Sequence, residues 1–237
     1  MDYNSERLPS VTKNLLIINF LAWMGTMAMR KYGIDWHQSF GLHFFLAPAF
    51  RIWQLFTYMF LHEGFAHLFF NMFAVWMFGR VMERTWGSRR FLIFYILCGL
   101  GAGACQELCQ YVHYNMVLSP YTEVNVEGTV ISMSQYLDYI ITVGASGAVY
   151  GVLLSYGMAY PNDRLIILPI PIPIRAKWVI TGYVALELML GLRNSAADNV
   201  AHFAHLGGML TGLIIILYWR MLTKIKKKKD NHINFTW

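Results

Sequence analysis

The sequence predicts an all-α membrane protein whose chain crosses the bilayer as six helices. Three observations predict this class. Hydrophobic residues make up 57% of the 237 residues, 14% are charged, and the mean hydropathy is +0.41, which is too apolar for an ordinary soluble domain. The apolar residues gather in six segments. The basic residues gather in the loops that follow every second segment.

Each apolar segment is close to the length that a helix needs to cross a bilayer, which is roughly 20 residues. The six segments are residues 14–30, 64–81, 91–111, 139–160, 177–193 and 200–221. We expect one six-span domain over residues 14–221, between an N-terminal tail of residues 1–13 and a basic tail of residues 222–237. Residues 31–62 are too polar and aromatic to span, so this first loop is expected to lie partly embedded in the membrane interface.

Basic residues predict the orientation of these spans. They follow the second, fourth and sixth segments as Arg80, Arg84, Arg89, Arg90, Arg164, Arg175, Lys177 and the run KIKKKK. Because basic loops stay in the cytoplasm, both termini are predicted to be cytoplasmic, and residues 112–138, which carry no Lys or Arg, form an outside loop. The net charge of +6 is therefore expected to meet anionic lipid and not nucleic acid.

The stretch HEGFAH, residues 62–67, is one residue longer than the His-Glu-x-x-His motif of zinc proteases. On one regular helix the two histidines would point about 140° apart, so they could share a metal only if a helix began between them. The cysteines are Cys98, Cys105 and Cys109, an odd number within one apolar segment, which argues against a disulfide framework. We predict no metal and no cofactor.

The fourth segment contains a serine in a setting that suits a nucleophile. In GASGAVYG, Ser146 lies between Gly144 and Gly147 near a helix start, where unpaired backbone N–H groups can bind an oxyanion. The small neighbours clear space around the hydroxyl and let another helix approach closely. A packing motif with an incidental serine would have the same composition.

The sixth segment contains a histidine on a face that suits close packing. In AHFAHLGGMLTG, His205, Gly208 and Gly212 lie at i, i+3 and i+7. If this face packs on the fourth segment, His205 can reach Ser146 and take its proton, since the pKa of histidine lies near neutrality. His202 lies on a similar face and stays an alternative base.

The second segment adds two hydrogen-bond donors. His67 and Asn71 lie at i and i+4 in HLFFN, so both can donate to one point beside the helix. Such polar residues also hold helices together in membranes. With the serine and the histidine, however, they complete the parts of an acyl-transfer site.

These motifs together resemble the rhomboid family of intramembrane serine proteases. The resemblance covers all six segments, and the motifs that carry it are HLFFN at 67–71, GASGAVYG at 144–151 and AHLGGMLTG at 204–212. It implies Ser146 as the nucleophile and His205 as the general base of a dyad without an acidic third member. It also implies an oxyanion hole of His67, Asn71 and the backbone N–H of Ser146, with Tyr150 packed on the histidine.

One pair of residues departs from the family pattern. Trp53-Gln54 stands where many members carry Trp-Arg, so the resemblance does not carry the anchoring of the first loop over to this pair. The chemistry of the site does not depend on it.

The predicted function is hydrolysis of peptide bonds in or near transmembrane segments of other proteins. Transmembrane substrates and lipid are the expected partners, no obligatory partner is evident, and a bacterial inner membrane is the expected location. Three alternatives are a protein of the same fold that binds membrane clients without cutting them, a six-span transporter and a zinc intramembrane protease. A transporter should carry polar residues along a path within its spans, and the residues found there are mainly the Ser, His and Asn named above.

Overall fold

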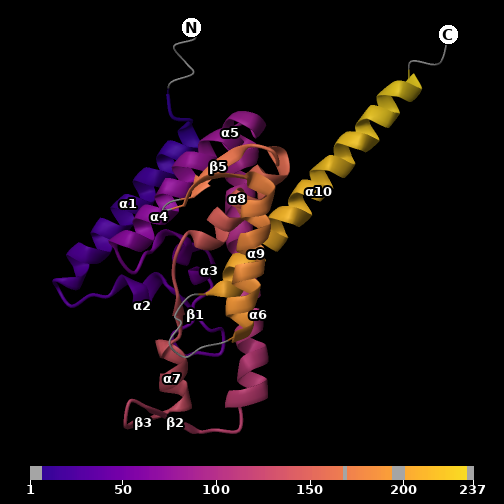
Figure 1. Ribbon diagram of the computed structural model, residues 1–237. Coiled ribbons are helices and arrows are strands. Elements are labelled where there is room, and N and C mark those ends of the chain that lie inside the picture. The colour runs from indigo at the N-terminus through magenta and orange to yellow at the C-terminus, as the bar shows by residue number, and fades with distance from the viewer. Residues whose placement is uncertain (1–6, 168–169, 194–200, 234–237) are drawn as a thin grey trace.

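The computed structural model describes residues 7–167, 170–193 and 201–233, and this part of the chain is predominantly helical (Figure 1). The longer helices are α1 (Ser10–Arg30), α4 (Phe65–Ala74), α5 (Arg80–Trp86), α6 (Ser88–His113), α8 (Ser146–Ala159), α9 (Ala176–Arg193) and α10 (His202–Ile233). The π-helical segment η3 (Val75–Gly79) joins α4 to α5, and η4 (Tyr114–Leu118) extends α6. Short helices α2 (Trp36–Phe40), α3 (Gln54–Thr57), η2 (Tyr58–Phe60) and α7 (Met133–Tyr139) lie between them.

In the described part of the chain, three two-stranded antiparallel sheets depart from the all-α prediction. They pair β1 (Leu42–His43) with β4 (Ile141–Thr142), β2 (Glu123–Val126) with β3 (Thr129–Ser132), and β5 (Arg164–Ile167) with β6 (Ile170–Arg175). Each lies outside the long helices, where the backbone N–H and C=O groups need partners that a helix does not supply. Positive φ angles at Glu127 and Gly128 form the tight turn of the β2–β3 hairpin.

Every predicted apolar segment overlaps a helix, but the boundaries and lengths differ. The predicted fourth span, residues 139–160, begins too early, because residues 141–142 form β4 and α8 starts at Ser146. Its 14 residues cover about 21 Å at 1.5 Å per residue, which is less than a bilayer core of about 30 Å. Among the described residues, three stretches are long and apolar enough to span: Phe65–Trp86, Ser88–Leu118 and His202–Ile225. The count of six spans therefore stays a prediction.

The ends of the predicted domain also differ from the helices. Helix α1 begins at Ser10, within the predicted N-terminal tail, and its first N–H groups are capped by the carboxylate of Glu83, which accepts from the backbone N–H groups of Val11 and Thr12 at 2.9 and 2.7 Å. Helix α10 continues past residue 221 to Ile233. Its C-terminal half extends away from the other helices (Figure 1). The basic run thus continues a helix.

Small residues set the packing of α6, α8 and α10. A Cβ atom added at Gly208 of α10 would overlap the carbonyl oxygen of Gly147 in α8, and one at Gly151 would lie 2.6 Å from the sulfur of Cys98 in α6. Backbones that approach this closely leave no room for side chains between them. Helices α6 and α10 also pack directly on each other, since a Cβ at Gly207 of α10 would lie 2.3 Å from Cβ of Cys105 in α6. The three helices therefore pack pairwise at the centre of the bundle.

The first loop is fixed to the rest of the molecule by buried polar side chains. Gln54 is 1% exposed, accepts from the backbone N–H of Arg51 at 3.0 Å and donates to the carbonyl oxygen of Ala49 at 3.1 Å. The carboxylate of Glu107 on α6 accepts from the backbone N–H of Phe45 at 2.7 Å. Gln54 thus anchors the loop without the charge of the arginine that many rhomboids carry.

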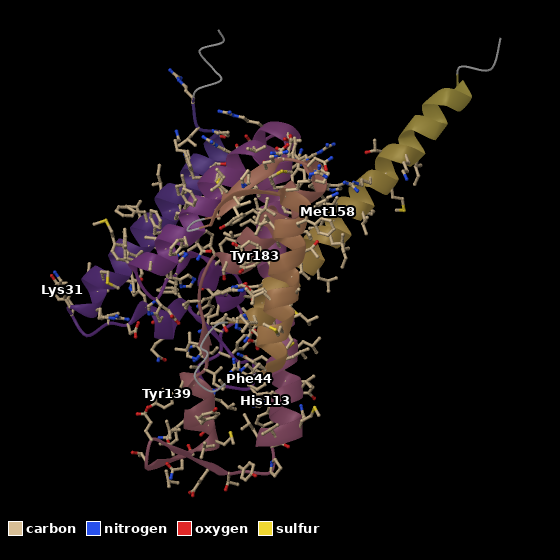
Figure 2. All side chains as sticks on the ribbon, in the orientation of Figure 1. Lys31, Phe44, His113, Tyr139, Met158 and Tyr183 are labelled. Carbon is tan, nitrogen blue, oxygen red and sulfur yellow. The ribbon has the colours of Figure 1, made fainter. Side chains whose placement is uncertain are left out.

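Aromatic packing and strand pairing hold the same loop against α6 and α8. Phe44, labelled near the end of α6 in Figure 2, has its ring centroid 5.9 Å from that of Tyr114. Strand β1 pairs with β4, which leads directly into the residues before α8. The backbone N–H of Gly144 donates to the carbonyl oxygen of Tyr58 at 2.9 Å. These contacts position the start of α8.

Candidate active site

Ser146 is the first residue of α8 and follows a glycine with an unusual backbone conformation. Gly144 has φ +131°, and a Cβ atom there would lie 2.8 Å from Cε1 and Nε2 of His67. An L-residue would meet both backbone strain and a side-chain clash at this position. The glycine therefore brings the chain close to α4 and turns it into α8 with Ser146 at the helix start.

His205 reaches Ser146 from α10. Its Nε2 atom lies 2.8 Å from the Oγ atom of Ser146, within hydrogen-bond distance. Both glycines of the predicted face pack on α8: Gly208 lies against Gly147, and a Cβ at Gly212 would be 3.4 Å from Cα of Gly151. This close helix contact lets a histidine and a serine that are 59 residues apart meet.

Tyr150 packs on the histidine ring. The two ring centroids lie 4.3 Å apart with an interplanar angle of 13°, a stacked arrangement. Tyr183 of α9, labelled in Figure 2, lies edge-on to Tyr150 at 6.1 Å. His205 is therefore held by α8 on one ring face, and α9 closes the other side of Tyr150.

The two predicted oxyanion donors of α4 are placed differently from one another. The ring of His67 lies against Gly144, two residues before Ser146. Asn71 is buried, and its side-chain amide donates to the carbonyl oxygen of His67 at 3.0 Å. One amide N–H is thus used within α4, and no hydrogen bond joins Asn71 to Ser146 in the described part of the chain. The second amide N–H is the one that a substrate could use.

The stretch HEGFAH does not form one regular helix. The argument that its two histidines point too far apart to bind one metal ion therefore does not apply. Helix α4 begins at Phe65, with Gly64 before it, and the ring centroids of His62 and His67 lie 4.9 Å apart. Both ring nitrogens of His62 are buried and have no hydrogen-bond partner among the described residues. Burial, with a smaller contribution from His67, lowers the pKa of His62 to about 3, so this ring is neutral near pH 7.

Glu187 of α9 is a residue of the site that the sequence analysis missed. It is 4% exposed, and its carboxylate accepts a hydrogen bond from the hydroxyl of Tyr150. Its Oε2 atom lies 2.6 Å from Nδ1 of His202 and 3.0 Å from Nδ1 of His205. The signal was available, since a carboxylate inside an apolar segment is costly and usually functional. The statement that the spans carry mainly Ser, His and Asn was wrong.

His202 and His205 share Glu187 as a neighbour but differ in their other contacts. The contact to Ser146 is made by His205, whereas His202 is hydrogen-bonded to Glu187. The centroids of the two imidazole rings lie 6.3 Å apart and the rings are nearly perpendicular. Of the two bases that the sequence left open, His205 is the one with the geometry for proton transfer from the serine.

One group of side chains also has the composition of a metal site: Glu187, His202 and His205. One ligand atom from each lies within 4.8 Å of the others, and among the described residues this is the group of three that fits that criterion. The separations of 2.6 and 3.0 Å between one carboxylate oxygen and two ring nitrogens are hydrogen-bond and ion-pair distances. The carboxylate of Glu187 is hydrogen-bonded to His202 and lies at ion-pair distance from His205.

The fold and the site together define a helical membrane protein with a partly buried serine–histidine contact. A family model described as the Rhomboid domain matches residues 49–221, so the chain belongs to the rhomboid family. It is 30% identical to Rhomboid protease GluP of Bacillus subtilis (strain 168) over 162 residues, which are 68% of this chain and 24% of GluP.

Two further relatives have the same level of identity. Rhomboid protease AarA of Providencia stuartii is 30% identical over 166 residues, 69% of this chain and 54% of AarA. The putative rhomboid protease YdcA of Bacillus subtilis is 30% identical over 164 residues, 69% of this chain and 65% of YdcA. The chain thus matches less than two thirds of the length of each of these curated relatives.

Proposed function

We propose that the protein is an intramembrane serine endopeptidase that hydrolyses peptide bonds in or near transmembrane segments of other membrane proteins. The observation that carries this proposal is the 2.8 Å contact between Oγ of Ser146 and Nε2 of His205, in a chain of the rhomboid family. The names of its relatives as proteases support the same activity.

In the proposed first step, His205 takes the proton from the hydroxyl of Ser146 while Oγ attacks the carbonyl carbon of the substrate. The carbonyl oxygen becomes an oxyanion, and the backbone N–H of Ser146, the second amide N–H of Asn71 and the ring of His67 are its proposed donors. The protonated His205 then donates to the leaving amine. Water, activated by the same histidine, releases the acyl group from the serine.

The substrates we propose are transmembrane proteins with weak helix formers near the cut. A helical backbone is fully hydrogen-bonded within itself, so the bond must leave its helix before Ser146 can attack it. Glycine and other weak helix formers lower the free energy needed for that local unwinding. We further propose six spans, cytoplasmic termini and a bacterial inner membrane, on the strength of the basic loops.

The test is cleavage of a generic transmembrane substrate by the purified protein in detergent and in liposomes. Wild type is compared with Ser146→Ala, His205→Ala and His202→Ala, each with and without EDTA. We expect wild type to cut in EDTA and both Ser146→Ala and His205→Ala to be inactive. If wild type binds the substrate without cutting it, the protease proposal is wrong and a binding protein is favoured. Loss of cleavage in EDTA would favour a metal-dependent mechanism.

A further inference from the structure

Glu187 is the one carboxylate that contacts the proposed base, among the described residues. It lies on α9, whereas Ser146 begins α8 and His205 belongs to α10. Oε2 of Glu187 is 3.0 Å from Nδ1 of His205, and Nε2 of the same ring is 2.8 Å from Oγ of Ser146. The carboxylate, imidazole and hydroxyl therefore follow one another in the order of a catalytic triad.

The tautomer of His205 follows from this order. If Nε2 accepts the proton of Ser146, the neutral ring must carry its own proton on Nδ1. That proton lies on the side of Glu187. Nδ1 of His205 has no hydrogen-bond partner among the described residues, but contacts of catalytic groups often align only when substrate is bound. The attraction between opposite charges needs no such alignment.

The carboxylate of Glu187 can stabilise the positive charge that forms on His205 in the proposed reaction. When Nε2 takes the serine proton, an imidazolium forms at a side chain that is 7% exposed. A charge in such surroundings costs free energy unless an opposite charge is close. Glu187 is itself buried, and its other contacts are the hydroxyl of Tyr150 and the ring of His202. These two donors hold the carboxylate in place.

We propose that Glu187 is a positioning residue of the site: it holds His205 with Nε2 toward Ser146 and stabilises the imidazolium formed in the proposed reaction. This inference rests on the proposed function. It changes the expected dyad into a Ser146–His205–Glu187 triad whose three members come from three helices. Among the described residues, Glu187 contacts His205 and not Ser146, so it acts through the histidine.

The experiment measures how fast a fluorophosphonate probe labels Ser146 across a range of pH, in wild type, Glu187→Gln and Glu187→Asp. No natural substrate is required, because the probe reports the nucleophilicity of the serine. Glu187→Gln keeps the shape and removes the charge, so we expect labelling near neutral pH to fall about tenfold or more, a part of the 10²–10⁴ that a general base supplies. Glu187→Asp should retain more activity than Glu187→Gln.

The pH profile separates this role from a structural one. The titratable groups around His205 are Glu187 on α9, Tyr150 on α8, His67 on α4 and His202 on its own helix. The negative charge favours the protonated ring, so its removal should move the acid limb of the labelling profile to lower pH. If Glu187 had only a structural role, Glu187→Gln would lower the stability of the fold and leave the acid limb of the labelling profile unchanged.

Glu107→Gln is the matched control, because Glu107 is also a buried carboxylate but accepts from a backbone N–H in the first loop. It should keep the wild-type acid limb. If Glu187→Gln does not fold, Glu187→Asp alone still tests the inference, since its shorter side chain should shift the limb in the same direction.

Three outcomes decide between the proposals. An unchanged rate and acid limb in folded Glu187→Gln would overturn the role of Glu187 and leave the protease intact. If EDTA abolishes labelling of wild type, the positioning role of Glu187 is wrong. Metal binding by Glu187, His202 and His205 is then favoured. A folded wild type that neither labels nor cleaves would overturn the proposed function itself.

Discussion

At position 144, a single methyl group would take the space that the ring of His67 occupies. A Cβ atom there would lie 2.8 Å from that ring, and φ is +131°. The conformation of the first loop likewise depends on one side chain. The amide of Gln54 accepts from one backbone group of this loop and donates to another. At the scale of residues, the site depends on positions that do not take part in the chemistry.

We expect Gly144→Ala to lose activity. The substitution adds backbone strain of about 1–3 kcal/mol and pushes His67 away from Ser146, and each 1.4 kcal/mol lost from the transition state is about tenfold in rate. The control is Gly182→Ala, where an added Cβ meets nothing within 4 Å. Cleavage rates of the two variants are compared at equal folded fraction. Equal rates would show that His67 does not need its present position.

We expect Gln54→Leu to lower the free energy of unfolding by about 1–3 kcal/mol for each backbone group left without a partner. Gln38 in α2 is exposed, so Gln38→Leu is the matched control and should have little effect. Thermal unfolding in detergent, followed by circular dichroism, measures both. A Gln54→Leu variant as stable as wild type would mean that water replaces the amide in the first loop.

Helices bring the reacting atoms together through their glycines. The serine belongs to α8 and the histidine to α10, and the distance between those helices fixes the distance between Oγ and Nε2. Gly208 lies directly against the backbone of Gly147. Because the obstacle is backbone and not a flexible side chain, a larger residue cannot be accommodated by a rotamer change.

Gly208→Ala should therefore separate α8 from α10 and abolish cleavage while both reacting side chains remain. The expected loss is at least about 100-fold, as for a misplacement of about 1 Å between reacting groups. Leu210→Ala, on an exposed face of α10, is the control and should stay active. Probe labelling of Ser146 gives the rate. Wild-type labelling by Gly208→Ala would contradict the dependence on this contact.

The sequence predicted more of the local pattern than of the tertiary contacts. The motif around Ser146 and the glycine face of His205 pointed to each other because helical periodicity reveals which residues share a face. Glu187 could be singled out as a carboxylate in an apolar segment, but not assigned partners, since these lie on α8 and α10 and only packing brings α9 to them. The start of α4 at Phe65 lies within one residue of the predicted segment, which begins at residue 64. Most strands of the small sheets escaped because they have two to four residues. The six-residue β6 escaped because the prolines of IPIPIR argue against a strand.

At the scale of the whole molecule, the predicted orientation can be tested directly. The β2–β3 hairpin lies at one end of the molecule and the β5–β6 hairpin at the other (Figure 1). The first follows a stretch without Lys or Arg, whereas the second contains Arg164 and Arg175. The two ends of the molecule thus differ in their basic residues, as expected if they lie on opposite sides of the membrane.

We expect a cysteine in place of Glu127 to react with an impermeant maleimide added outside the cell, and one in place of Lys224 to react only after lysis. Both residues are exposed. The background variant has Cys98, Cys105 and Cys109 replaced by alanine, and its unlabelled band is the control. Labelling of both positions from the same side would contradict the predicted orientation.

The arrangement of the site over three helices also sets the order in which it is made. A ribosome synthesises Ser146 first, Glu187 next and His205 last, since α8, α9 and α10 follow one another along the chain. The proposed nucleophile is therefore made before its proposed base, and the 2.8 Å contact between them cannot form until α10 has docked. Under the proposed mechanism, Ser146 of a nascent chain would lack its base while it lies among unfolded transmembrane segments.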